Sequence, residues 1–435
     1  MASEAEGKGH MTGSEGAEDL TEDLMEWLTG CRMKPGMRDK NWRTRLEDWI
    51  VERPERLTRL AVACMREGLD AHFDPLWGYL PTSDWPAIAR VAVETLIAHT
   101  AVSHRTLVIE TLEYCGLQQP AALHPYLTEL FAFGNISHLG AELAFREATW
   151  DQVAFLEQSL RSPANNEERE RAVTCLMETR LPEALSLVAT LDQPSLLAQL
   201  TRIGFAQAEK GFVRLYPDEP LHMTFSSDYF QRIQRHARHI HPTWSMRDDA
   251  APIHRFGGWG DVTCGACGGR VSHLVTLDLV PPTIGVSGLE RLELVACLSC
   301  IGLYREHLVY QHDQHGTPSD LNDTGAPEQR EWQVMPIEET SVGFASLGPR
   351  WRWQDFALST FENQSRLGGH PSWIQPAEYP ACHGCGGVMR FLLQLDGSFP
   401  LANGQSSDYL WVAGDKGYIF WCDACKISTV IAQWT

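Results

Sequence analysis

The first half of the chain has the hydrophobic spacing of amphipathic helices. Between about Asp19 and Glu209, apolar residues recur every three or four positions, which places them on one helical face. The turns between these segments are only a few residues long, so we expect antiparallel helix pairs stacked as an irregular solenoid or bundle. No fixed repeat of about 34 or 40 residues is present, and no named repeat class is predicted. Early helices are expected near Asn41–Val51, Glu55–Glu67, Trp85–His99, His104–Cys115 and Ala121–Phe133.

Helix starts in the later part of this region carry local signals. Thr149-Trp-Asp-Gln152 has the spacing of a capping box. Asn166 precedes two glutamates, which favour a helix N-terminus. Pro182 and Pro194 stand where a proline fits the first helical turn. These positions predict four further short helices.

After about Ala251 the pattern changes to short apolar runs bounded by glycine, proline and polar residues. Runs of this length with turn-forming flanks are typical of β-strands. Strands are expected at 274–280, 292–296, 303–310, 391–395, 409–412, 418–421 and 427–434.

The two hydrophobic patterns predict an α+β protein, with an all-α helical stack followed by a β-rich domain. The N-terminus is polar and rich in Gly, Glu and Ser, a composition typical of disorder. We expect a disordered tail at 1–17, an α-helical domain at 18–210, a connector at 211–250, and a duplicated β-rich domain at 251–435 whose halves span about 251–316 and 332–435.

Composition sets further limits. The 435 residues, 43% of them hydrophobic, are sufficient for two or three globular domains. No apolar run reaches the roughly 18 residues that a membrane span needs. The N-terminus lacks the basic start and apolar core of a signal peptide. We therefore expect a cytoplasmic protein, in which thiols stay reduced.

The net charge of −20 narrows the choice of partners. An acidic chain repels a phosphate backbone unless it contains a basic patch, so nucleic acid is disfavoured. The same charge favours a basic protein partner. Alternatively, the acidity only aids solubility.

One cysteine motif occurs twice, with an offset of 118 residues. Each copy is C-x-x-C-G-G followed by L-x-x-L-D, and each has a second C-x-x-C pair downstream. Two duplicated sets of four thiols predict two tetrahedral metal sites, and zinc is the metal typical of such sets. The predicted ligands are Cys264, Cys267, Cys297 and Cys300 for the first site, and Cys382, Cys385, Cys422 and Cys425 for the second.

The spacing around these cysteines favours a structural role for the metal. An R-[FL]-G-G motif precedes each copy, beginning at Arg255 and at Arg366. Twenty-nine residues separate Cys267 from Cys297, which is more than a compact zinc ribbon contains, so each site closes a loop across a larger β domain. A catalytic or redox centre is the alternative. Four thiolates leave no open coordination position, which argues against catalysis.

The second copy resembles the YwqG-like family of bacterial proteins. The resemblance rests on Ser365-Arg-Leu-Gly-Gly-His-Pro-Ser-Trp373, Tyr379-Pro-Ala-Cys382 and Val388-Met-Arg-Phe-Leu-Leu-Gln-Leu-Asp396, and it extends over about 251–435. The first copy departs from the pattern: His254-Arg-Phe-Gly-Gly-Trp lacks the proline. The resemblance implies a β-rich fold with two related halves. Some members of the family resemble immunity proteins encoded beside bacterial toxins, which implies a protein partner.

Several histidines are alternative metal ligands. His236, His239 and His241 form an H-x-x-H-x-H cluster beside a row of arginines, and the other interpretation is a solvated basic helix. His312 and His315 are expected on the surface, and His383, inside the second knuckle, is expected to point outward.

The four remaining cysteines and five of the tryptophans are expected in the core. These are Cys31, Cys64, Cys115, Cys175, Trp351, Trp353, Trp411, Trp421 and Trp434, with an exposed tryptophan surface for binding as the alternative.

Function is less constrained than fold. No P-loop, G-x-G-x-x-G, G-x-S-x-G, H-E-x-x-H or kinase signature is present, so no enzyme mechanism is indicated. The favoured hypothesis is an immunity-type protein that neutralises a cognate bacterial toxin by direct binding, with structural zinc. The alternatives are a zinc-ribbon protein associated with nucleic acid and an unrecognised enzyme.

Overall fold

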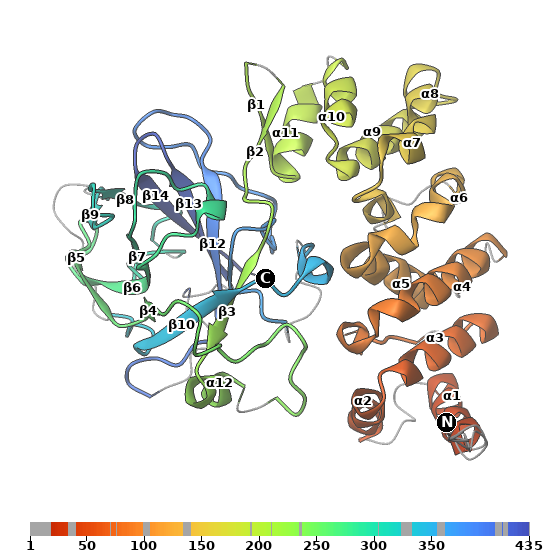
Figure 1. Ribbon diagram of the computed structural model, residues 1–435. Coiled ribbons are helices and arrows are strands. Elements are labelled where there is room, and N and C mark those ends of the chain that lie inside the picture. The colour runs from red at the N-terminus through yellow and green to blue at the C-terminus, as the bar shows by residue number, and fades with distance from the viewer. Residues whose placement is uncertain are drawn as a thin grey trace, which may run out of the picture. The chain divides into compact units, whose positions relative to one another are not determined.

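A computed structural model shows helices in the first half of the chain and a large β-sheet in the second (Figure 1). The predicted α+β class is confirmed. The chain divides into two compact units, Met1–Leu112 and Glu113–Thr435, and the boundary falls inside one helix. The structure describes residues 19–33, 41–69, 71–74, 76–98, 105–133, 141–191, 194–209, 211–234, 237–302, 304–322, 333–354, 362–404, 411 and 416–434. The tail expected at 1–17 lies outside these residues.

The helices lie close to their predicted positions. Their bounds are α1 Asp19–Arg32, α2 Trp42–Glu52, α3 Glu55–Glu67, α4 Trp85–Ala98, α5 Arg105–Gln118, α6 Leu127–Ala132, α7 Trp150–Val153, α8 Phe155–Arg161, α9 Asn166–Thr179, α10 Pro182–Ala189 and α11 Pro194–Arg202. The single helix expected at Ala121–Phe133 is wrong in detail. It is replaced by two 3-10 turns, Pro120–Ala122 and His124–Tyr126, and the short α6, because Pro120 and Pro125 cannot donate backbone hydrogen bonds.

The predicted helix starts are largely confirmed. Thr149 and Gln152 form a reciprocal capping box at the start of α7. Helix α9 is capped one residue earlier than predicted: the Asn165 side chain accepts a hydrogen bond from the Glu168 amide at 2.8 Å. Helix α10 begins at Pro182. A side-chain acceptor at each of the first two starts satisfies an amide that has no partner within the helix.

A buried carboxylate organises the unit Met1–Leu112. Glu110 accepts hydrogen bonds from the Phe73 amide, the Asp74 amide and the Trp77 indole at 2.7, 2.9 and 2.7 Å. Trp77 also stacks on Trp85 at 5.6 Å. One acidic side chain therefore joins α5 to the 3-10 turn that leads into α4, and it satisfies donors that burial would otherwise leave unpaired.

The second unit contains a two-stranded sheet and a twelve-stranded sheet among its described residues. In the large sheet the order is β5-β6-β4-β10-β3-β11-β12-β13-β14-β8-β9, and β7 pairs with β6. The strands are β1 Phe205–Gln207, β2 Phe212–Arg214, β3 Leu221–Phe225, β4 His254–Phe256, β5 Trp259–Thr263, β6 Arg270–Leu277, β7 Leu292–Ala296, β8 Leu308–His312, β9 Pro318–Asp320, β10 Thr340–Ala345, β11 Arg366–Leu367, β12 Arg390–Asp396, β13 Lys416–Cys422 and β14 Ile427–Gln433.

The sequence duplication is reproduced in the backbone pairing. Strand β4 pairs with β6 through Arg255 and Thr276, and β11 pairs with β12 through Arg366 and Gln394. In the first copy the pair β6–β7 has a register shift between His273 and Val275. In the second copy the pair β12–β13 has one between Phe391 and Leu393, which is the same position of the motif. A bulge kept at the same place in both copies shows that they share local geometry as well as cysteine spacing.

The two halves exchange strands at the centre of the sheet. Strand β3, which precedes the first copy, pairs with β11 of the second copy. Strand β10, which precedes the second copy, pairs with β4 of the first copy. The two exchanged strands also pair with each other, from Phe225↔Val342 to His222↔Ala345. The segment 211–250, expected to be a connector, thus carries a central strand, β3, and helix α12 (Ser227–Ile233).

A second exchange makes the sheet barrel-like. Strand β8 belongs to the first half by sequence, but it pairs with β14 of the second. Beyond β8, the Asp320 carboxylate at the end of β9 accepts a hydrogen bond from the Gly265 amide at 3.0 Å. Gly265 lies in the turn between β5 and β6, so the end of the sheet returns to its beginning.

Most of the residues predicted to lie in the core are buried. This holds for Cys31, Cys64, Cys115, Cys175, Trp351, Trp353, Trp411 and Trp421, and Trp434 is half-buried. The described tryptophans of that set therefore pack the interior, and the alternative of an exposed tryptophan surface is wrong for them.

The two equivalent arginines of the R-[FL]-G-G motifs have different environments. Arg366 is completely buried. Its guanidinium donates to the carbonyls of Gln354, Gln364 and His370 and to the Ser372 hydroxyl. A charged donor shared by carbonyls from two loops holds both loops against β11. Arg255 instead lies 41% exposed and pairs with Glu339.

Replacing Arg366 with methionine should lower the free energy of unfolding by about 3 kcal/mol or more, because three buried carbonyls would lose their donor. Arg390→Met, at the exposed first residue of the neighbouring strand β12, is the matched control, with an expected change within about 0.5 kcal/mol. Urea unfolding followed by tryptophan fluorescence measures both. Equal stability of the two variants would show that the Arg366 network does not stabilise the fold.

Candidate metal centres

The first cysteine pair of each copy forms the same knuckle turn. The Cys264 amide donates to the Gly269 carbonyl at 2.8 Å, and the Gly268 amide donates to the Cys264 carbonyl at 2.7 Å. The second copy repeats both bonds, Cys382 to Gly387 and Gly386 to Cys382, at 2.8 Å each. The glycine after the second cysteine has a left-handed backbone in both turns, φ +72° at Gly268 and +71° at Gly386. Glycine adopts this conformation at little cost, which explains C-x-x-C-G in both copies.

The second pair of each copy comes from a strand end. Cys297 and Cys300 directly follow β7, whereas Cys422 ends β13 and Cys425 lies in the turn between β13 and β14. Since β7 runs beside β6 and β13 runs beside β12, each strand end arrives next to the knuckle that precedes its partner strand. The topology therefore brings together four residues that the sequence separates by about 30 to 40 positions.

The thiols converge with distances suited to one metal ion per cluster. All four Sγ atoms lie within 4.8 Å of one another in each set. The Sγ–Sγ distances are 3.6 Å for Cys267–Cys297 and 4.0 Å for Cys264–Cys300. In the second set the Cys385–Cys422 distance is 3.8 Å. Four sulfur ligands at about 2.3 Å from a tetrahedral ion lie about 3.8 Å apart. All eight predicted ligands thus form two four-cysteine clusters that could hold metal ions.

The two clusters differ in solvent access. All four cysteines of the first cluster are buried. In the second, Cys382 is buried, Cys422 and Cys425 are half-buried, and Cys385 is exposed. The first cluster also has a supporting hydroxyl, since the buried Tyr310 accepts a hydrogen bond from the Cys297 amide at 3.0 Å. Sequence spacing did not single out this tyrosine, because it lies in β8, ten residues beyond Cys300 and outside both C-x-x-C pairs.

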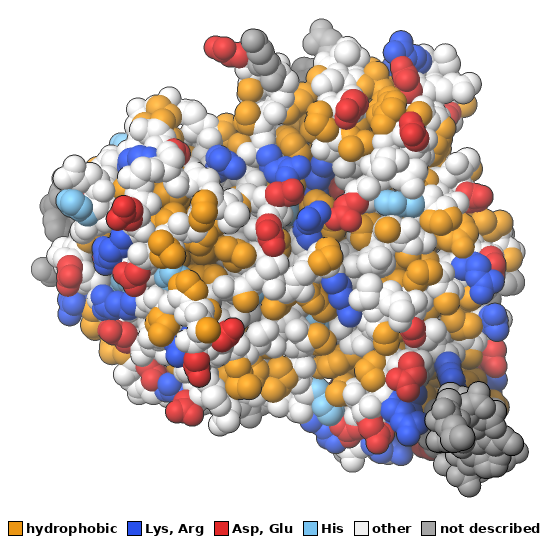
Figure 2. All heavy atoms as spheres, in the orientation of Figure 1, with side chains coloured by type: hydrophobic (Ala, Val, Ile, Leu, Met, Phe, Trp, Pro, Cys, Tyr) orange, Lys and Arg blue, Asp and Glu red, His pale blue; other side chains and the backbone are white. Residues whose placement is uncertain are grey.

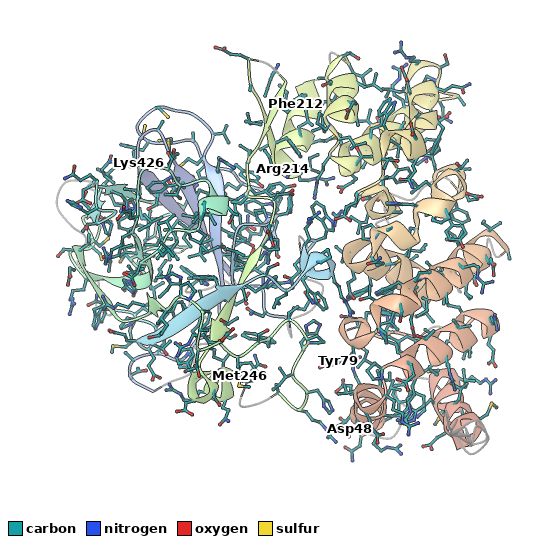
Figure 3. The ribbon with its side chains drawn as sticks, viewed as in Figure 1. Asp48, Tyr79, Phe212, Arg214, Met246 and Lys426 are labelled. Atoms are coloured by element: carbon teal, nitrogen blue, oxygen red, sulfur yellow. The ribbon has the colours of Figure 1, made fainter. Side chains whose placement is uncertain are left out.

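A loop of the first half contacts the second cluster. The Ser287 amide and hydroxyl donate to the carboxylate of Asp423, which lies between Cys422 and Cys425. Lys426, which is labelled in Figure 3, completes the clamp. Its ammonium lies 2.9 Å from Asp423 and 2.6 Å from the Ser287 carbonyl. Although partial burial opposes it, these hydrogen bonds hold the pKa of Asp423 below its usual value. The clamp therefore keeps an ionised aspartate beside the cluster.

Hydrogen bonding favours a thiolate in each cluster. Bonds from the Cys297 and Cys300 side chains, together with backbone amides, lower the pKa of Cys264. In the second cluster the Gly387 amide, followed by the neighbouring thiols, lowers the pKa of Cys385. A metal ion binds cysteine as the thiolate, so these turns prepare ligand atoms for a cation.

The histidine cluster is not a metal site in the described part of the chain. His241 is buried, its Nδ1 lies 2.8 Å from the Thr243 hydroxyl, and its ring packs on Trp351. Burial lowers the pKa of His241 to about 3, so the ring is neutral. His239 is half-buried and joins no metal-ligating group, whereas His236 lies outside the described residues.

The structure contradicts a second expectation, which concerns the position of His312. It was expected on the surface, but it is 3% exposed and packs on Trp421. Its Nε2 lies 2.8 Å from the Ser428 hydroxyl and its Nδ1 lies 3.3 Å from the Gly316 carbonyl. The apolar alternation of β8 points this residue inward. His315 and His383 are exposed, as predicted.

Comparison with known proteins gives one distant relative. The chain is 26% identical over 164 residues to the uncharacterized protein YpfL of Salmonella typhimurium strain LT2, and the match covers 36% of each chain. It thus spans about a third of the length of that relative. No family model matches the chain, and no solved structure gives a significant match. Among the described helices, none has the length and apolar content that a membrane crossing requires.

Metal should leave the exposed cluster first. When a metal-loaded sample is mixed with excess chelator, we expect release in two phases of equal amplitude. Their rate constants should differ by about tenfold or more, corresponding to about 1.4 kcal/mol in the free energy of local opening. Cys385→Ser should abolish the fast phase, and Cys267→Ser the slow one. Release in one phase, or a fast phase that survives Cys385→Ser, would contradict the difference between the clusters.

The buried imidazole of His312 should make stability fall in mild acid. Burial lowers its pKa to about 4, whereas an unfolded histidine titrates near pH 6.5. The unfolded chain therefore binds more protons between these values, and the contribution is complete above about pH 6.5 and lost as pH falls toward 4. Between pH 7 and pH 5, wild type should lose about 2 kcal/mol more unfolding free energy than His312→Gln. If the unfolding free energies of wild type and His312→Gln fell equally between pH 7 and pH 5, the prediction would be wrong.

Proposed function

We propose that this chain is an immunity-type protein that binds a cognate bacterial toxin directly and neutralises it, with two zinc ions as structural braces. The observation that carries the proposal is the closure of both four-cysteine clusters. Each cluster supplies four thiol ligands at tetrahedral spacing. Zinc is the ion that prefers this ligand set, and four cysteines leave no position for a substrate.

The position of the clusters supports a structural role for the metal. Each links a knuckle to the end of an adjacent strand, at the margin of the sheet rather than in a cavity. An ion there would fix each knuckle turn to its strand end and so add to the stability of the fold. Activity is then to be sought on the protein surface, which favours binding over catalysis.

Charge supports a protein partner. The net charge of −20 would attract a basic protein and repel nucleic acid. Figure 2 shows acidic and basic side chains interspersed over the face that it draws, whereas a nucleic-acid site needs a basic stripe. The resemblance of residues 251–435 to YwqG-like proteins, some of which resemble immunity proteins, supports a toxin as that partner. A cytoplasmic location fits cysteines that form no disulfide among the described residues.

The proposal predicts that a gene beside this one encodes the toxin, and it is tested with that protein. Co-expression of this chain should restore growth to cells that produce the toxin. The two purified proteins should form a complex with a Kd below about 1 µM that weakens as salt rises. Asp423→Asn is the control variant. It weakens the hydrogen bonds of Asp423 without removing a cysteine, so the protein should stay folded and should still restore growth.

Two outcomes would overturn the proposal. The first is failure of the folded, metal-loaded protein to bind the toxin at micromolar concentration. The second is salt-dependent binding to a random oligonucleotide with comparable affinity, which would favour a nucleic-acid role instead.

A further inference from the structure

A cavity of about 390 Å³ lies beside α9 in the unit Glu113–Thr435 and is bounded on its other side by the segment 370–377. Among the described residues that line it are three arginines and three glutamates, whose charges offset one another. Two of the arginines, Arg146 and Arg180, pair with the Glu178 carboxylate. The cavity therefore presents no clear excess of charge to a ligand, and the second cysteine cluster carries a more specific chemical feature.

The second cluster presents a sulfur ligand to solvent. Cys385 is exposed, and so is the whole run 383–388 around it in the knuckle turn. The residue at the same position of the first copy is Cys267, which is buried. Since thiols are oxidised according to their exposure and thiolate character, the two equivalent cysteines should differ in reactivity.

Neighbouring segments cover the first knuckle. The Asp320 carboxylate accepts a hydrogen bond from the Gly265 amide at 3.0 Å, and the Gln333 side chain donates to the Arg270 carbonyl at 2.7 Å. A Cβ added at Gly269 would meet the Gln333 Nε2 atom at 3.2 Å. The first knuckle is thus in contact with chain that follows it by more than fifty residues.

The corresponding face of the second knuckle is open. A Cβ added at Gly387, the equivalent of Gly269, would meet only the Cys385 Sγ atom, at 3.5 Å, among the described residues. A Cβ added at Gly386 would meet no described atom within 4 Å. A small solute can therefore reach the Cys385 sulfur from this side.

A second thiol lies beside the exposed one. The Cys422 Sγ atom is 3.8 Å from the Cys385 Sγ atom. A disulfide needs about 2.05 Å, so an approach of about 1.8 Å closes the bond. The Asp423 carboxylate, held by the Ser287 amide at 2.9 Å, fixes the end of β13 next to Cys422. The movement then falls to the knuckle, where Gly386 faces open space.

We propose that Cys385 is a site of oxidation by hydrogen peroxide and then forms a disulfide with Cys422. The Cys385 thiolate attacks one peroxide oxygen, the O–O bond breaks and hydroxide leaves, so the sulfur is oxidised to a sulfenic acid and the peroxide is reduced. The Cys422 thiolate attacks that sulfur, displaces a second hydroxide and forms the S–S bond. Two protons from solvent convert the two hydroxides to water.

The disulfide removes two ligands from the second cluster. Cys382 and Cys425 remain, and two thiolates do not complete a tetrahedral site. The oxidised chain therefore loses the metal ion of this cluster and keeps that of the buried one. The reaction does not involve the toxin, so this proposal and the proposed function can fail separately.

Peroxide treatment of the zinc-loaded full chain tests the proposal. Released zinc is followed with a colorimetric chelator, and disulfides are mapped by peptide mass spectrometry after alkylation. In millimolar hydrogen peroxide we expect release of one of the two zinc ions, a peptide pair joined through Cys385 and Cys422, and reduced cysteines in the first cluster. A dithiol reductant with added zinc should restore the second ion. Retention of both ions, release of both at one rate, or a map in which Cys385 is not joined to Cys422 would overturn the proposal.

Two matched histidine variants locate the reactive thiol. Cys385→His keeps four zinc ligands but removes the oxidisable sulfur, so zinc release from the second cluster should be at least about tenfold slower. Cys267→His makes the same change at the equivalent position of the first copy and should leave that release at the wild-type rate. Release from a zinc-loaded Cys385→His as fast as from wild type would show that another thiol is the target and refute the site. The wild-type disulfide map decides the question even if a variant fails to fold.

Discussion

The antiparallel pairing of β3 with β10 connects the two halves of the β domain. Each of these strands precedes one copy of the cysteine unit and pairs with the other copy, so neither half completes its sheet without the other. Strand β8 repeats the exchange at the far end by pairing with β14. Two copies linked in this way form one continuous sheet rather than two separate domains.

Equivalent positions in the two copies have acquired different roles. Arg255 and Arg366 hold the same place in the strand pairing, but only Arg366 is buried and shared among loop carbonyls. The knuckles have the same turn, but only the first is closed off from solvent. Duplication therefore supplied a common backbone, and the surroundings of each copy determined its exposure, its charge and its neighbours.

The cysteine clusters and the cavity differ in the elements that form them. Each cluster joins a knuckle turn to the end of an adjacent strand. The cavity beside α9 is instead lined by arginines, glutamates, a histidine and a tryptophan from elements that are distant in sequence. The segment Ser365–Trp373 connects β11 to the cavity, because Arg366 supports the same loop that lines it.

Sequence alone determined the features that depend on local spacing. The helices, six of the described strands (β6, β7, β8, β12, β13 and β14), the capping box and both ligand sets follow from periodicity and from repeated C-x-x-C turns, since short-range geometry sets them. It missed β3, a five-residue strand in a segment with no distinctive local pattern, whose place in the sheet depends on β10 and β11 more than a hundred residues later. It also misplaced His312, which lies in the core because β8 pairs with β14. The exchange of strands, the different burial of the two clusters and the cavity were decided only by the tertiary structure. Each depends on which distant surfaces meet, and the spacing of residues along one segment carries no information about its partner.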